Sequence, residues 1–148
     1  MRYLATLTLI IGTTIATLSV LARADDAPRH VTVYKDPQCS CCEGYADYLR
    51  HNGFDVTVVN THDLALMNEE AGVPSELQGC HLAKVDGYVI GGHVPVDIVN
   101  RLLSEKPAIK GVTLPGMPMG SPGMTGTKTA PFKIYEITDG PPHVYATE

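Results

Sequence analysis

Three of the four cysteines fall within four positions of one short stretch, and this crowding limits what the chain can fold into. The stretch is Asp36-Pro37-Gln38-Cys39-Ser40-Cys41-Cys42, at the point where a strand-like pattern gives way to a helical one. A bridge between the adjacent Cys41 and Cys42 would need a strained geometry. A Cys39–Cys42 bridge closes so short a loop that it stabilises the chain little by entropy. The crowding therefore indicates thiol redox chemistry or metal binding rather than two ordinary disulfides.

The first 24 residues are expected to be a cleaved signal peptide. Arg2 supplies a positive start, Leu4–Leu21 is uncharged and mostly apolar, and Ala22-Arg23-Ala24 has the small-x-small form of a cleavage site. A retained membrane anchor is the alternative, but the stretch is near the minimum length for a span and is diluted by Gly and Thr. We therefore expect a periplasmic protein without a stable membrane anchor, and one domain over residues 25–148.

The charge of the mature chain argues against one class of partner. Loss of two arginines with the signal peptide leaves 9 basic residues against 16 acidic ones, so the formal charge is −7. No basic run offsets this charge, and binding to nucleic acid is not expected. Metal cations are not repelled by such a surface.

The hydrophobic pattern predicts alternating strands and helices. His30–Tyr34 alternates as a strand does, and Cys41–His51 carries apolar residues at helical spacing up to a stop at Asn52-Gly53. The later elements expected are a strand at 54–59, a helix capped by Thr61 or Asp63, strands at 82–85 and 88–90 around an Asp86-Gly87 turn, and a helix that begins near Pro95.

A long segment without periodicity follows these elements. Thr113–Pro131 is rich in Gly, Pro, Ser and Met, a composition typical of a loop. A loop of this length in a small domain is usually functional or disordered. Phe132–Ile137 then returns as an extra strand, and the remaining residues are expected to form a short tail.

The order β-α-β-α-β-β-α predicts an α/β domain of the thioredoxin-like class, with a Gly/Pro/Met-rich C-terminal loop and one extra strand. In that fold a C-x-x-C motif lies at the N-terminus of the first helix, where Cys39–Cys42 falls here. The unpaired N–H groups and the helix dipole at that end favour thiolate over thiol. Asp86–Gly92 also resembles the passage from hairpin to last helix in glutaredoxins.

The fourth cysteine, Cys80, is expected to join the other three. In thioredoxin-like folds the start of the third strand faces the C-x-x-C motif, and Gly79-Cys80-His81 occupies that place. Four thiols exceed what a dithiol shuttle needs, but they suit Cu(I), Zn(II) or an iron–sulfur cluster. The adjacent pair Cys41-Cys42 would bridge several ions more readily than it would close on one.

Copper is the metal that the pattern favours. An exported site disfavours an iron–sulfur cluster, and structural zinc prefers two separate C-x-x-C knuckles. Cu(I) accepts thiolates and also thioethers, which the Met-rich segment could supply. Secondary ligand or supporting roles are expected for four residues, with structural roles as the alternative: His93, Met117, Met119 and Met124.

The remaining histidines are ranked low as ligands. His81 would point to the opposite face of an extended strand from Cys80. The other four are expected at the surface: His30, His51, His62 and His143.

Five motifs in one order resemble the CopG-type periplasmic copper-resistance proteins, long known only as an uncharacterised metal-binding family. They are Tyr34-Lys-Asp-Pro-Gln-Cys-Ser-Cys-Cys42, Asn52-Gly-Phe-Asp-Val56, Gly79-Cys-His81, Asp86-Gly-Tyr-Val-Ile-Gly-Gly-His-Val-Pro95 and Pro115-Gly-Met-Pro-Met-Gly-Ser-Pro-Gly-Met124. The family usually has Gly where this chain has Ser40, and often Ser where it has Gly79, and neither change removes a ligand.

This resemblance implies a thioredoxin-like fold and a copper-resistance role. By motif position it implies a cluster of more than one Cu(I), held by Cys39, Cys41, Cys42 and Cys80. It leaves open whether the protein is a copper oxidoreductase that interconverts Cu(I) and Cu(II), and it assigns no catalytic residue. The partners implied are copper ions and periplasmic copper-efflux or copper-oxidase components.

Two other classes of function stay open from the residues alone. The first is a thiol–disulfide oxidoreductase that uses the C-x-x-C motif, which metal-free disulfide turnover would reveal. The second is an exported domain stapled by two disulfides, one of them Cys39–Cys42. Metal content and thiol count of freshly purified protein would distinguish the three.

Overall fold

The computed structural model describes residues 27–148. The predicted signal peptide, residues 1–24, and the expected start of the domain at residue 25 lie outside this range. Within it, no helix combines the length and the apolar character that a membrane crossing needs. The elements in chain order are β1 (His30–Lys35), α1 (Ser40–His51), β2 (Asp55–Asn60), α2 (Leu64–Glu70), the 3-10 turn η1 (Ser75–Leu77), β3 (His81–Val85), β4 (Tyr88–Gly91), α3 (Val96–Glu105), β5 (Gly111–Thr113), β6 (Lys133–Ile137) and β7 (Val144–Thr147).

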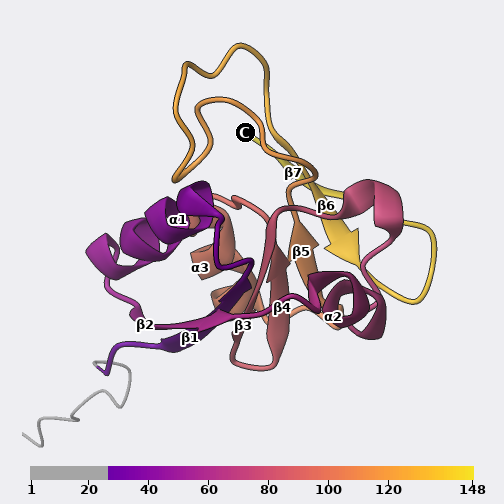
Figure 1. Ribbon diagram of the computed structural model, residues 1–148. Helices are drawn as coiled ribbons and strands as arrows, with labels where there is room; N and C mark the ends of the chain where they lie inside the picture. The colour runs from indigo at the N-terminus through magenta and orange to yellow at the C-terminus, as the bar shows by residue number, and fades with distance from the viewer. Residues whose placement is uncertain (1–26) are drawn as a thin grey trace, which may run out of the picture.

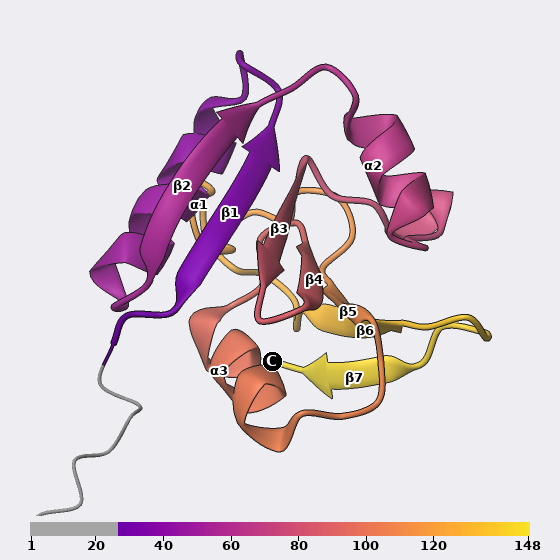
Figure 2. The ribbon, with the colours of Figure 1, turned by 90° about the horizontal axis from the view of Figure 1, so that it is seen from below.

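All seven strands form one mixed sheet in the order β2-β1-β3-β4-β5-β6-β7 (Figure 2). β1 pairs in parallel with β2 and antiparallel with β3. The β3–β4 hairpin turns at Asp86 and Gly87, which both have positive φ, as an Asp-Gly turn of this kind requires. The predicted order of strands and helices from β1 to α3 is confirmed, and so is the α/β class. The thioredoxin-like assignment stays a prediction.

Two strands were not predicted. β5 has only three residues, and the sequence pattern assigned Thr113 to the loop. All three are buried between β4 and β6. This strand therefore forms because its backbone pairs with both neighbouring strands, and not because its sequence alternates between apolar and polar residues. The C-terminal residues, expected to be a tail, form β7 and pair with β6 at the sheet edge. That expectation was wrong because pairing with β6, the preceding strand, satisfies backbone groups of a segment that has no strand pattern of its own.

The helices cover both faces of the sheet (Figure 1). One face carries the larger core, where Tyr45 and Leu49 of α1 and Val99 and Leu102 of α3 pack against the strands. The opposite face carries a smaller core beneath α2, which includes Leu82 of β3. Tyr45 of α1 and Ala83 of β3 both belong to the larger core, so the first turn of α1 and the start of β3 lie beside it.

Residues 114–131, here called the Met loop, are the irregular segment that the composition predicted. The near end is held by backbone bonds from Leu114 N–H to the Gly91 carbonyl (2.9 Å) and from Gly116 N–H to the Gln78 carbonyl (3.0 Å). The middle of the loop, at Gly123, crosses the start of α1 (Figure 1). A Cβ at Gly44 would lie 2.9 Å from the Gly123 carbonyl oxygen, so this close crossing needs glycine in the helix.

Candidate metal centre

A tight turn delivers the first cysteine to the N-terminus of α1. The Asp36 carbonyl accepts the N–H of Cys39 (3.0 Å), and the Asp36 carboxylate accepts the N–H of Gln38 (2.8 Å). Cys39 is the N-cap residue, with extended backbone and no side-chain cap bond. Because its sulfur makes no capping bond, it can face the sulfurs of Cys41 and Cys42, which lie in the first turn of α1.

Close backbone packing brings the fourth cysteine to the same place. Gly79 passes so near the β4–α3 connection that a Cβ there would lie 2.5 Å from the Gly92 Cα atom. Gly79 also forms an isolated bridge with Gly116 of the Met loop. Cys80 follows in a bend between Gly79 and β3, so its side chain is not bound to the alternation of the strand.

The four sulfurs form one group, with every pair of sulfurs within 4.8 Å. Cys41 Sγ lies 3.4 Å from Cys39 Sγ and 3.8 Å from Cys80 Sγ. Cys42 Sγ lies 3.5 Å from Cys80 Sγ and is joined to Cys39 in a disulfide. The predicted approach of Cys80 to the other three is thus observed.

This spacing fits soft-metal coordination. An ion about 2.3 Å from each of two sulfurs at tetrahedral or trigonal angles would separate them by about 3.8–4.0 Å. The distances from Cys41 and Cys42 to Cys80 are close to that range. The Cys39–Cys42 disulfide must be reduced before those two sulfurs can be ligands, because the thiolate is the ligand form.

Burial sets the protonation of Cys80. Burial and, after it, the neighbouring Cys41 sulfur together raise the pKa of the Cys80 thiol to about 12. The metal-free side chain is therefore a neutral thiol at pH 7. A metal that binds here must displace this proton.

His93 is held as metal-binding histidines commonly are. Its Nδ1 lies 2.7 Å from the Pro122 carbonyl oxygen, which can only accept, so Nδ1 carries the proton. Nε2 is then an acceptor and lies 3.0 Å from Cys80 Sγ. Burial lowers the pKa of His93, which keeps the ring neutral. A carbonyl that orients one nitrogen while the other faces the site is the arrangement that supports a ligand.

His81 also belongs to this site, and the expectation that it points away from Cys80 was wrong. Its Nδ1 lies 3.6 Å from Cys80 Sγ, and the ring is fully buried. The alternation rule fails because Cys80 precedes the strand. The ring centroid of His81 lies 4.5 Å from that of Tyr45 in a tilted arrangement and 4.9 Å from that of His93, which it meets edge-on. Burial and, after it, the neighbouring His93 together lower the pKa of His81 to about 3.

Cys80, His81 and His93 make a second group of potential ligands, with their ligand atoms within 4.8 Å of one another. The Nε2 atom of His81 is buried and has no hydrogen-bond partner among residues 27–148. Cys80 is common to this group and to the four-sulfur group. The sequence offered one signal for His81, namely its position next to a candidate ligand.

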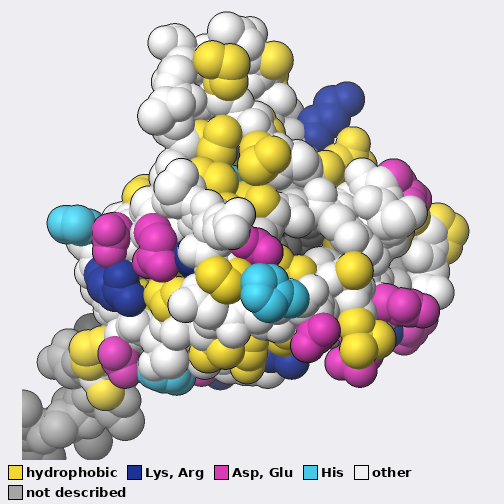
Figure 3. Space-filling view, viewed as in Figure 1, with side chains coloured by type: hydrophobic (Ala, Val, Ile, Leu, Met, Phe, Trp, Pro, Cys, Tyr) yellow, Lys and Arg dark blue, Asp and Glu magenta, His cyan; other side chains and the backbone are white. Residues whose placement is uncertain are grey.

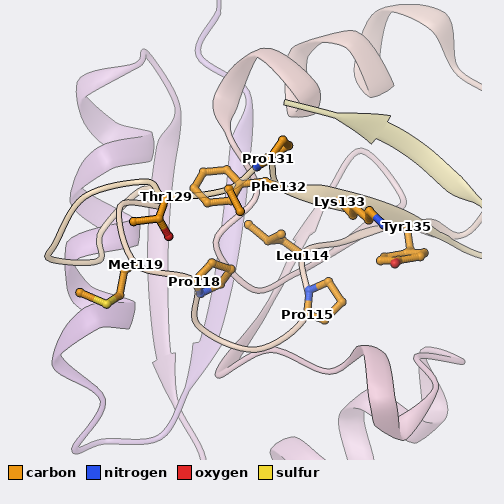
Figure 4. A pocket seen from close by; sticks show the side chains of 10 residues that line it. Leu114, Pro115, Pro118, Met119, Thr129, Pro131, Phe132, Lys133 and Tyr135 are labelled. Carbon is orange, nitrogen blue, oxygen red and sulfur yellow. The ribbon is translucent and has the colours of Figure 1, made fainter.

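Two of the three candidate methionines are exposed at the surface. Met117 is 54% exposed and Met119 is 63% exposed, and apolar side chains gather on the projection at the top of the molecule in Figure 3. Met119 borders a pocket of about 440 Å³ between the Met loop and β6, together with Leu114 and Phe132 (Figure 4). Met124 is half-buried. Ligand roles for these methionines stay predictions.

The four histidines expected at the surface are exposed: His30, His51, His62 and His143. This prediction is confirmed.

Comparison with known proteins identified two kinds of match. A family model described as a protein of unknown function, DUF411, matches residues 77–124. Two solved structures titled copper resistance protein CopG, Form 2 and Form 1, are 33% identical to this chain, with TM-scores of 0.75 and 0.74. Each alignment covers 82% of this chain and 98% of the other. Among curated proteins, none matched the sequence.

Proposed function

The chain belongs to the CopG-type family of copper-resistance proteins, and from this premise we propose that it binds Cu(I) in a cysteine-thiolate cluster in the periplasm. The proposed ligands are Cys39, Cys41, Cys42 and Cys80. The observation that carries the proposal is the convergence of the four sulfurs within 4.8 Å of one another, although Cys80 is separated from the other three by 38 positions or more in the sequence.

The donor set supports more than one copper ion. Thiolates bridge soft ions readily, and the adjacent Cys41 and Cys42 project from one helical turn. Cys80 contacts the sulfurs of both, so it can bridge ions held by either. Cu(I) needs few ligands and no strict geometry, which suits a site built from one short motif and one distant cysteine.

Cys80 also connects the sulfur group to the imidazoles of His81 and His93. Imidazole with thiolate is a donor set that accommodates Cu(II). Copper held on Cys80 could therefore exchange between sulfur-rich and nitrogen-rich surroundings. This supports the proposed interconversion of Cu(I) and Cu(II), in which one electron is exchanged with a redox partner, the histidines stabilise the oxidised ion and the cysteines stabilise the reduced one.

The proposed location and partners follow from the N-terminal sequence and the family. The signal-peptide pattern of residues 1–24 supports export. In the periplasm, copper-efflux or copper-oxidase components are the proposed partners. The three methionines of the Met loop are proposed to assist copper near the site.

The test is copper content of periplasmic protein purified without oxygen after growth in copper. We expect more than one copper per chain, copper–sulfur scattering in X-ray absorption, and blocked thiols that react once copper is removed. Cys80→Ser should lower the copper content, and His143→Ala, which alters an exposed histidine, should not. Stoichiometric zinc with negligible copper affinity would overturn the proposal.

A second function is favoured by one observation, the Cys39–Cys42 disulfide at the start of α1. This is the arrangement of thiol–disulfide oxidoreductases. Metal-free protein would then reduce disulfides in an insulin assay, and the double variant Cys41→Ser/Cys80→Ser would keep this activity. Loss of activity in that variant would count against the oxidoreductase.

A further inference from the structure

Lys35 carries its positive charge into a position where charge is costly. In β1, Val31, Val33 and Lys35 lie on the same face, since alternate residues of a strand point to one side. The two valines are core residues, and Lys35 is only 1% exposed. Lysine is almost never fully buried unless its ammonium is paired. The pattern of the strand would place an apolar residue here.

Four oxygen atoms from the segments around the cysteine motif surround this ammonium. Nζ donates to the carbonyl oxygens of Asp36 (3.0 Å) and Pro37 (3.4 Å), in the turn before Cys39. It donates to Asn60 Oδ1 at the end of β2 (3.3 Å). It also pairs with the Glu43 carboxylate in the first turn of α1 (3.2 Å). Lys35 thus joins the turn, the helix and the strand that frame the site.

This network reaches the cysteines through short paths. The Asp36 carbonyl that accepts from Lys35 also accepts the N–H of Cys39 (3.0 Å). Glu43 directly follows Cys42 in the sequence. On the other side, Lys35 is paired in register with His81, the residue after Cys80. A shift of Lys35 would therefore displace both parts of the four-sulfur group.

The electrostatics indicate an anionic neighbour. The N-terminus of α1 is already positive, so a cation beside it is unfavourable. Glu43 supplies one negative charge, but its side chain is 51% exposed and its field is screened by water. Cysteines that bind copper must be thiolates. The copper-binding form of the motif thus supplies negative charge that Lys35 can balance.

We propose that Lys35 is a positioning residue of the copper site. It holds the turn that presents Cys39, and its charge stabilises the thiolate form of the motif over the protonated and disulfide forms. This inference rests on the proposed copper binding.

The first test is Cu(I) affinity, measured without oxygen by competition with bathocuproine disulfonate. Lys35→Met keeps the length of the side chain and removes the charge, and we expect about tenfold weaker binding. Lys35→Arg keeps the charge and should restore most of the affinity. Glu43→Gln leaves Lys35 unbalanced and should bind Cu(I) more tightly. Unchanged affinity in Lys35→Met, or weaker binding in Glu43→Gln, would overturn the proposal.

The second test uses metal-free protein in glutathione redox buffers, with the Cys39–Cys42 pair followed by thiol alkylation and mass mapping. Two glutathione thiols supply two electrons and two protons and become glutathione disulfide. One cysteine of the reduced pair keeps a proton as a thiol, and the other, as the thiolate that Lys35 stabilises, releases its proton to the buffer. We expect Lys35→Met to lower the equilibrium constant for reduction about tenfold, or about 30 mV, and Glu43→Gln to raise it. A role in packing alone would move both variants the same way or not at all.

The two proposals fail separately. Wild-type protein that binds no Cu(I) would overturn the proposed function, while the redox comparison would still test the charge of Lys35. Wild-type protein that binds Cu(I) as tightly as Lys35→Met would overturn the inference alone. If circular dichroism shows that Lys35→Met does not fold, the other two variants, Lys35→Arg and Glu43→Gln, test the inference instead. Equal Cu(I) affinity and an equal redox equilibrium in Glu43→Gln and wild type would then refute the role of charge.

Discussion

The hydroxyl of Tyr45 offers a sharp test of how the site is supported. Tyr45 is fully buried in α1, and its hydroxyl donates to the Val94 carbonyl oxygen at 2.9 Å. Val94 is also fully buried, so water cannot replace the lost donor in Tyr45→Phe. We expect a loss of about 1–3 kcal/mol in the free energy of unfolding, the cost of leaving a buried carbonyl unpaired.

The matched control lies one turn further along the same helix. The Tyr48 hydroxyl accepts the N–H of Val96 at 2.9 Å, but Tyr48 is only half-buried. Val96 is 8% exposed, whereas Val94 is fully buried, so water reaches the Val96 N–H more readily in Tyr48→Phe. We therefore expect a smaller loss than in Tyr45→Phe, below about 1 kcal/mol.

Urea denaturation of metal-free, reduced protein, monitored by circular dichroism, measures both changes. The dependence of the unfolding free energy on urea should be unchanged, because neither variant alters the surface exposed on unfolding. Tyr45→Phe within about 0.5 kcal/mol of wild type, or less destabilised than Tyr48→Phe, would refute the reasoning from burial.

Three further predictions concern the backbone and the buried histidine. A Cβ at Gly79 would lie 2.5 Å from the Gly92 Cα atom, so Gly79→Ala should lower the urea midpoint more than Gly53→Ala does. A Cβ at Gly53 would meet nothing within 4 Å, and its cost comes from the φ of +85° alone. Burial lowers the pKa of His81 from 6.5 to about 3. Below pH 6.5 the unfolded chain therefore binds a proton that the folded chain does not, and stability should fall towards pH 3 by up to about 1.4 kcal/mol per pH unit. In metal-free His81→Asn, urea midpoints measured at several pH values should lack this part of the pH dependence. A pH dependence identical to that of the wild type would contradict the assignment to His81. A Cβ at Gly123 would collide with backbone atoms at the start of α1, so Gly123→Ala should detach the Met loop and speed its cleavage by a protease, whereas unchanged cleavage would show that the loop is held elsewhere.

Much of this protein could be predicted from short stretches of sequence. The alternation of His30–Tyr34, the Asp86-Gly87 turn and the helical spacing after Cys41 act over a few residues, and each element formed where it was expected. The crowding of the cysteines indicated their chemistry for the same reason, since neighbours in sequence are necessarily close in space.

The tertiary structure decided what depends on distant partners. Cys80 reaches the motif because Gly79 can pass against the backbone at Gly92, and His81 turns toward the site because a bend precedes its strand. β5 and β7 exist only because neighbouring strands complete their hydrogen bonds. Lys35 looked like the end of a strand, yet it is buried beneath the cysteine turn. Sequence determines the local conformations and the chemistry available, whereas burial and close approach arise only when packed elements exclude water from between them.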